Sequence, residues 1–264
     1  MAPRLTRSLK HEYELFVEHE IENYKESVPR SVLLSLGDEA VAALAKQQQL
    51  ALTELLLCEE VDRIIFRRLR LPSYQTWRKR RVRIADEIRR PEHWGLRADD
   101  VVVRNVPVQG EGHVLVAGAS PELPALYLAA NGCDVTAIAP EQDAVERVMH
   151  AATEAGLTGR LHACLADLAS WTPDLPLSAV IVSPAALAGL SADQRARVIA
   201  LLQGATADGG VHLVQTIVAS GKKGEQVSLE ELRTRYRGWD VTVERDETVA
   251  GGRAKTFLAR KGAA

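Results

Sequence analysis

Arginine is concentrated in one segment of the chain, and arginine is the side chain best suited to binding phosphate groups. Residues 63–97 hold 12 Lys and Arg against three Asp and Glu, although the protein of 264 residues has a formal net charge of −2. Tyr74 and Trp77 stand between the first two arginine clusters, where their rings could stack on a flat ligand. The segment is therefore a candidate substrate or nucleic-acid surface. Its alternatives are pairing with the acidic first helix and exposure to water, which are favoured because no nucleic-acid-binding motif accompanies it.

Histidines and cysteines give no metal site. His11 and His19 lie among glutamates, but eight helical residues separate them by about 12 Å, so one ion cannot bind both. The three cysteines, Cys58, Cys133 and Cys164, form no C-x-x-C pair. An exposed acidic helix face and reduced thiols are the simpler interpretation.

Two kinds of periodicity divide the chain. Residues 1–95 show only the three- and four-residue spacing of helices, and we predict a separate helical lobe there. The predicted helices cover 9–28, 38–46, 49–70 and from Ser73 to about Arg90.

Short apolar stretches alternate with helical ones in residues 100–264, which predicts a parallel sheet with helices on both faces. The predicted strands are 113–117, 134–138, 160–164, 178–182 and 210–216, and the predicted helices are 122–131, 141–155 and 192–204. Two final strands, 239–244 and 255–260, flank Gly251-Gly252 and predict an antiparallel edge.

This α/β pattern resembles the Rossmann-like, seven-stranded fold of class I S-adenosylmethionine-dependent methyltransferases. The segments that carry the resemblance are LYLAANGCDVT from Leu126 to Thr136, Ala166-Asp167-Leu168, and ADGGV from Ala207 to Val211. The first segment and the chain's ending are most similar to the tellurite-resistance (TehB-like) small-molecule methyltransferases. The resemblance covers about residues 112–261 and implies S-adenosylmethionine as the cofactor.

The cofactor motif of that family is degraded in this chain. By resemblance, the cofactor-binding residues are Gly118, Ala119, Ser120, Ala139, Asp167, Leu168 and Ser183. The family's D-x-G-x-G-x-G turn reads VAGASPE from Val116 to Glu122, so Gly118 alone is kept. Ala139 replaces an acid that holds the ribose, which removes hydrogen bonds worth about 1.5–3 kcal/mol. Asp167 stands where the family places an acid near the adenine amine.

No catalytic residue is predicted. The segment from Ser183 to Leu187 offers no acid or histidine, and His150 and His162 adjoin no ligand-facing strand end. An acceptor with a free lone pair needs only positioning. The resemblance implies a histidine–arginine pair between the last strands, of which only Arg253, a candidate substrate residue, is present.

The leading hypothesis is a methyltransferase-like protein with a small-molecule acceptor. The alternatives are a catalytically inactive scaffold or binding protein with this fold, and a nucleic-acid methyltransferase that uses the Arg-rich helix. For the lobe we predict that residues 72–95 lie over or beside the crevice, and the alternative is a homodimer through Leu52, Leu56 and Ile64. No membrane span or signal peptide is recognised, so a cytoplasmic protein is expected.

Overall fold

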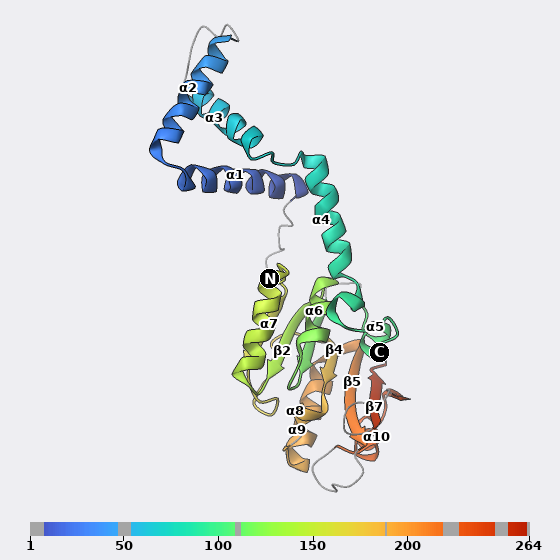
Figure 1. Cartoon of the computed structure of the whole chain (residues 1–264). Coiled ribbons are helices and arrows are strands. Elements are labelled where there is room, and N and C mark those ends of the chain that lie inside the picture. The colour runs from blue at the N-terminus through green and yellow to red at the C-terminus, as the bar shows by residue number, and fades with distance from the viewer. Residues whose placement is uncertain are drawn as a thin grey trace. The chain divides into compact units, whose positions relative to one another are not determined.

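The computed structural model describes residues 8–46, 54–108, 112–187, 189–218, 227–245 and 253–262. The chain divides into two compact units, residues 1–84 and 85–264 (Figure 1). The division falls inside helix α4 (Tyr74–Ile88), whereas the sequence predicted a lobe ending near residue 95. In the described parts of the chain, no helix is long and apolar enough to cross a membrane.

The first unit is helical, as its periodicity predicts. It contains α1 (Leu9–Ser27), α2 (Arg30–Lys46), α3 (Glu54–Arg68) and the first part of α4. Its core is formed by Ile21, Leu36, Ala40, Ile64 and Ile65. Ile64 is only 5% exposed in this core, so it is not available to a homodimer surface as the sequence suggested. Leu56 is half-buried, and Leu52 lies outside the described residues.

Helix α2 begins much earlier than predicted. The pair Gly37-Asp38 resembles a helix start, but the helix begins at Arg30, where the Pro29 carbonyl accepts a hydrogen bond from the Val32 amide. Leu36 and Ala40, on the two sides of Gly37, are fully buried against the rest of the lobe. Packing of this continuous apolar face therefore overrides the low helix propensity of Gly37.

The turn after α3 carries a local conformational cost at Arg70, whose φ is +51°. The Leu71 amide donates to the Phe66 carbonyl and the Arg70 amide to the Arg67 carbonyl, which is a left-handed helix cap that suits glycine. We expect Arg70→Gly to raise the free energy of unfolding by about 1 kcal/mol, because a Cβ is disfavoured in this region. Chemical denaturation measures the change. Arg70→Ala, which keeps the Cβ, is the control, and equal stability of the two variants would contradict the explanation.

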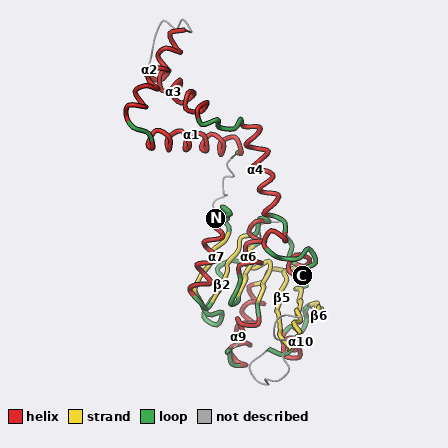
Figure 2. The backbone as a smooth tube through the Cα atoms, viewed as in Figure 1, coloured by secondary structure: helices red, strands yellow, loops and turns green. Residues whose placement is uncertain are grey.

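The second unit contains one seven-stranded sheet with the order β3-β2-β1-β4-β5-β7-β6 (Figure 2). The strands are β1 (His113–Ala117), β2 (Asp134–Ala139), β3 (Leu161–Leu165), β4 (Leu177–Val182), β5 (Thr206–Val218), β6 (Asp240–Arg245) and β7 (Arg253–Arg260). The first five pair in parallel, and β7 is antiparallel to both β5 and β6. The predicted mostly parallel sheet with an antiparallel edge is confirmed.

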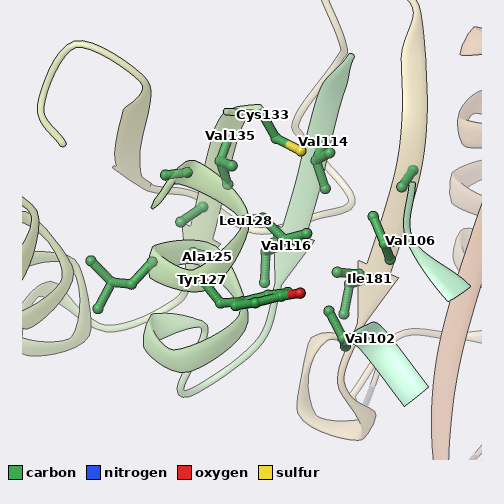
Figure 3. Close-up of a cluster of buried hydrophobic side chains, with 14 of the residues drawn as sticks. Val102, Val106, Val114, Val116, Ala125, Tyr127, Leu128, Cys133, Val135 and Ile181 are labelled. Carbon is green, nitrogen blue, oxygen red and sulfur yellow. The ribbon is translucent and has the colours of Figure 1, made fainter. Parts of the chain in front are cut away.

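Helices cover both faces of the sheet. They are η1 (Pro91–Trp94), α5 (Val101–Asn105), α6 (Glu122–Ala130), α7 (Gln142–Glu154), α8 (Pro184–Leu187), α9 (Ala192–Ala205) and α10 (Leu229–Arg235). Alternate residues of β1 pack into two layers, one on each face of the sheet. Val114 and Val116 belong to the first layer, with α5, α6 and α7. Leu115 and Ala117 belong to the second layer, with α8, α9 and α10. Figure 3 shows the first layer, in which Tyr127 and Leu128 of α6 lie near the β1 valines. Residues Leu126 to Ala129 of the LYLAANG stretch are thus part of the core.

A buried polar network lies in the second layer. His212 of β5 is fully buried, its Nε2 is 2.6 Å from Thr206 Oγ1, and its Nδ1 is 2.8 Å from the Tyr236 hydroxyl. Thr206 donates its own proton to the Leu202 carbonyl, so it accepts from Nε2, and Tyr236 donates to Nδ1. Burial lowers the pKa of His212 to about 3, with a smaller contribution from the nearby charge of Lys261. The imidazole is therefore neutral in the folded protein.

Candidate functional site

A cavity of about 250 Å³ lies at the carboxyl ends of β1 to β4. Parallel sheets of this kind bind ligands at that edge. The lining residues are Ala117, Gly118, Ile138, Pro140, Ala166, Asp167, Leu168, Ala185, Ala186, Gly189 and Leu190. Three of the predicted cofactor residues, Gly118, Asp167 and Leu168, are therefore brought together in one wall.

Gly118 is held by hydrogen bonds that continue the sheet past the end of β1. Its amide donates to the Ile138 carbonyl at 3.0 Å, and the Ser183 amide donates to the Ala117 carbonyl at 2.9 Å. A Cβ on Gly118 would lie 2.1 Å from Ser183 Oγ and 2.8 Å from Ser183 Cβ. The resemblance counts Gly118 among the cofactor-binding residues, and in the structure it is Ser183 that leaves no space for a side chain there.

Ser183 does not line the cavity, although the resemblance counted it among the cofactor residues. Its hydroxyl oxygen is buried and has no hydrogen-bond partner among the described residues. Such atoms are uncommon in folded proteins, because an unpaired buried hydroxyl loses its hydration without compensation. Its role toward a cofactor stays a prediction.

Asp167 is exposed at the cavity wall, in the turn that follows β3. Its Oδ1 accepts a hydrogen bond from the Ala169 amide at 2.9 Å, and its carbonyl accepts one from the Ser170 hydroxyl. These contacts fix the orientation of the carboxylate. Its second oxygen, Oδ2, accepts no hydrogen bond from the described residues and can receive one from a ligand.

The substituted positions of the glycine motif have local structural roles. Glu122, at the place of the third glycine, begins α6 and accepts a hydrogen bond from Arg147 Nε of α7 at 2.8 Å. Ala119 is half-buried and Ser120 is exposed, and neither lines the cavity. The loop after β1 is therefore held by contacts between helices rather than shaped by a run of glycines.

The end of β2 offers no carboxylate to a ligand. Ala139 is 1% exposed and its carbonyl accepts a hydrogen bond from the Ala166 amide, while Pro140 lines the cavity. The first atoms of an aspartate side chain at residue 139 would be buried, as those of Ala139 are. Restoring the family's acid there therefore carries a desolvation cost.

The chemistry available in the cavity is limited. Among its described lining residues Asp167 is the only titratable group, and no group of three metal-binding side chains occurs in the described parts of the chain. His150 and His162 are both exposed outside the lining, as predicted. The cavity can position a ligand between apolar walls, but it supplies no histidine or cysteine.

Tyr74 and Trp77 belong to an aromatic cluster in the helical unit. Their ring centroids lie 5.4 and 5.6 Å from that of Tyr13, and Trp77 also lies 6.2 Å from Phe16. The Tyr13 hydroxyl donates to the Pro72 carbonyl. Packing of α4 on α1 accounts for both rings. The side chain of Arg253, the third predicted substrate residue, lies outside the described residues.

Several lining residues were missed from the sequence, namely Ile138, Pro140, Ala185, Ala186 and Leu190. Ile138 and Pro140 could have been found, because they flank the predicted end of the second strand. Leu190 follows the short helix α8. A helix of four residues is too short to show a helical periodicity in the sequence, so neither the helix nor Leu190 could be predicted.

Comparisons with known proteins agree with this geometry. The sequence profile of the family described as tellurite resistance protein TehB matches residues 96–256. No protein of the curated set matches the chain. The solved structures of TehB from Haemophilus influenzae and of the [4+2]-cyclase SpnF superpose with TM-scores of 0.51 and 0.50.

Both similarities are in the fold, since the sequence identities are 18% and 19%. The match to H. influenzae TehB covers 61% of this chain and spans 61% of that one, and the match to SpnF covers 62% and 80%. The profile match covers more than half of this chain and nearly all of the α/β unit. The chain belongs to the TehB family.

Proposed function

We propose that this protein is an S-adenosylmethionine-dependent methyltransferase with a small-molecule acceptor. The observation that carries the proposal is the cavity at the carboxyl ends of β1 to β4, with Gly118 and Asp167 in its wall. Its place on the sheet is where the fold binds ligands. Membership of the TehB family supports the same activity.

The residues present suit the adenine end of that cofactor. Ile138, Leu168 and Leu190 provide apolar walls for a flat ring, and Asp167 would accept a hydrogen bond from its amine. When bound, S-adenosylmethionine supplies an electrophilic methyl group. The role of the chain is to hold the two reactants in position and to exclude water.

The cavity offers fewer hydrogen-bond partners to the ribose of the cofactor than to its adenine. Neither Ala139 nor Pro140 provides a carboxylate for the hydroxyl groups. The cavity of about 250 Å³ is below the ordinary size of a small-molecule site, which is roughly 300–1,000 Å³. We therefore expect weak affinity for the cofactor and an opening of the cavity walls when it enters.

The acceptor we propose carries a free lone pair at neutral pH. A hydroxyl acceptor would need a general base within hydrogen-bond reach, and Asp167 is the only described titratable group in the lining. A soft acceptor such as a chalcogen compound needs no such base. The family's description as a tellurite resistance protein is in line with that chemistry.

Calorimetric titration with S-adenosylmethionine and S-adenosylhomocysteine tests the proposal. We expect both to bind, and Asp167→Asn to weaken binding about tenfold. The side-chain oxygen of Asn can still accept the hydrogen bond from the Ala169 amide, but the negative charge is lost. Asp174→Asn, at an exposed aspartate outside the lining, is the matched control and should bind as the original protein does. Equal affinity of the two variants would exclude Asp167 from the site.

A second candidate, a catalytically inactive scaffold with this fold, is favoured by the missing carboxylate at Ala139. The same titration separates the two. Absence of any heat of binding with about 1 mM ligand would overturn the enzyme and leave the scaffold.

A further inference from the structure

Helix α4 presents an exposed cluster of basic side chains that the proposed function does not use. The cluster consists of Arg78, Lys79, Arg80 and Arg83, all of them exposed, and it lies within the helical unit. No residue of α4 is buried. The cavity is lined only by residues of the α/β unit, so the cluster is not a part of its wall.

Three of the basic side chains around this cluster, Arg63, Arg68 and Arg81, are paired with acids, but the cluster is not. Arg68 pairs with Glu39, Arg63 with Glu60 at 2.5 Å, and Arg81 with Glu12 at 3.8 Å. Within the described structure, none of the four cluster residues has a carboxylate within 4 Å. The basic segment is therefore paired with acids only in part, and the four positive charges of the cluster are not compensated by carboxylates in the described structure.

These charges repel one another along the helix. Lys79 and Arg83 are four residues apart and Arg80 and Arg83 three apart, which are the spacings at which like charges destabilise a helix. The first turn of α4 contains no acid to offset them. A bound polyanion would relieve this repulsion, whereas a neutral partner would not.

We propose that the α4 cluster binds the phosphate backbone of a nucleic acid without reading its sequence. Three of its four members are arginines, whose planar guanidinium groups hold phosphate oxygens by two hydrogen bonds at once. The nearby rings of Tyr74 and Trp77 are engaged with Tyr13, so stacking on bases is not part of the interaction. Contacts to phosphates alone account for affinity without specificity.

The surface of α4 is less suited to an anionic membrane. Its exposed apolar side chains are Val82 and Ile84, with 42% and 47% of their surface accessible. Two residues apart in a helix, these short side chains point about 200° apart and form no common apolar face that could enter a bilayer. The longer side chains of Arg78 and Arg80, at the same spacing, can by contrast bend toward a common ligand.

Fluorescence anisotropy of labelled short nucleic acids tests the proposal, with single-stranded RNA, single-stranded DNA and duplex RNA as probes. Four phosphate contacts on a single strand predict that Kd rises about 50-fold between about 50 and 200 mM salt. Replacing all four cluster residues by Gln should abolish both the binding and its salt dependence. Replacing the three arginines by Lys should retain the salt slope and part of the affinity.

The matched control removes the same charge elsewhere. It carries Gln at Arg30, Arg197, Arg233 and Arg237, which are exposed and have no ion pair among the described residues. This control should bind nucleic acid as the original protein does. Equal weakening of the two quadruple variants would overturn the proposal, as would absence of binding to all three probes at low salt. Preferential, cluster-dependent binding to vesicles of equal parts phosphatidylcholine and phosphatidylserine would overturn it in favour of a membrane.

The inference does not depend on methyl transfer. The quadruple α4 variant should titrate S-adenosylhomocysteine as the original protein does, so failure of one proposal leaves the other measurable. Similar probe affinities would assign the site to phosphodiesters in general, and a preference for one probe would identify the kind of strand.

Discussion

Acid is expected to destabilise this protein through His212, by about 1.4 kcal/mol for each pH unit between about pH 6 and pH 3. The folded-state pKa of His212 is lowered to about 3, whereas in the unfolded chain it is near 6.5. As the pH falls through this range the unfolded chain binds a proton that the folded protein excludes, so stability decreases with falling pH. The full loss approaches roughly 5 kcal/mol, which is a large fraction of a domain's stability.

The low pKa of His212 follows from its burial, and the hydrogen bonds around the imidazole favour its neutral form. Both imidazole nitrogens are occupied, since Nε2 donates to Thr206 and Nδ1 accepts from Tyr236. A proton on Nδ1 would face the hydroxyl proton of Tyr236 in a fully buried site. Burial also raises the pKa of Tyr236, so the hydroxyl stays protonated at neutral and acidic pH.

Urea denaturation of the original protein and of His212→Gln at pH values between about 6.5 and 5 separates this contribution, because carboxylates titrate mainly below that range and His113, whose pKa burial also lowers, is present in both. His212→Gln should be less stable at neutral pH but should show a flatter dependence on pH. His150→Gln, at an exposed histidine beside Glu154, should retain the original slope. Identical slopes for His212→Gln and the original protein would contradict the assignment.

The second large effect is expected at Gly118. Gly118→Ala should lower the free energy of unfolding by about 1–3 kcal/mol and weaken cofactor binding, because its Cβ would overlap the Ser183 side chain. Adding Ser183→Gly removes both overlapping atoms and should restore most of that stability. Gly159→Ala is the control, since a Cβ there meets nothing within 4 Å.

Denaturation of the two single variants and the double variant gives a coupling energy between the two positions. We expect a stabilising coupling of about 1 kcal/mol or more. If Gly118→Ala costs no more than Gly159→Ala, the close packing of β1 and β4 at this point is not what requires the glycine.

The strands were predicted more accurately than the helical lobe, and the reason is physical. The central strands β1 and β4 are buried on both faces, so their apolar runs mark their ends closely, as at His113–Ala117. In the lobe, by contrast, Gly37-Asp38 has the local features of a helix start, and only packing of Leu36 and Ala40 carries the helix through them. That packing involves α3 and cannot be read from the local sequence.

The site was predicted in part for a similar reason. The ends of the strands identify Gly118, Asp167 and Leu168, but not which neighbouring residues lie outside the lining, as Ser120 does. Ser183 requires a glycine at residue 118, and this can be recognised only from the register of β1 against β4, which pairs Ala117 with Val182. Sequence alone places these two residues 65 positions apart.

The cavity at the carboxyl ends of β1 to β4 is where we expect S-adenosylmethionine and its product to bind. Amide hydrogen exchange with and without S-adenosylhomocysteine, at about 1 mM ligand, tests it most directly. We expect added protection concentrated in residues 117–120, 138–140, 166–168 and 184–187, with the remaining amides unchanged. Protection confined to other segments, or none at all, would contradict it.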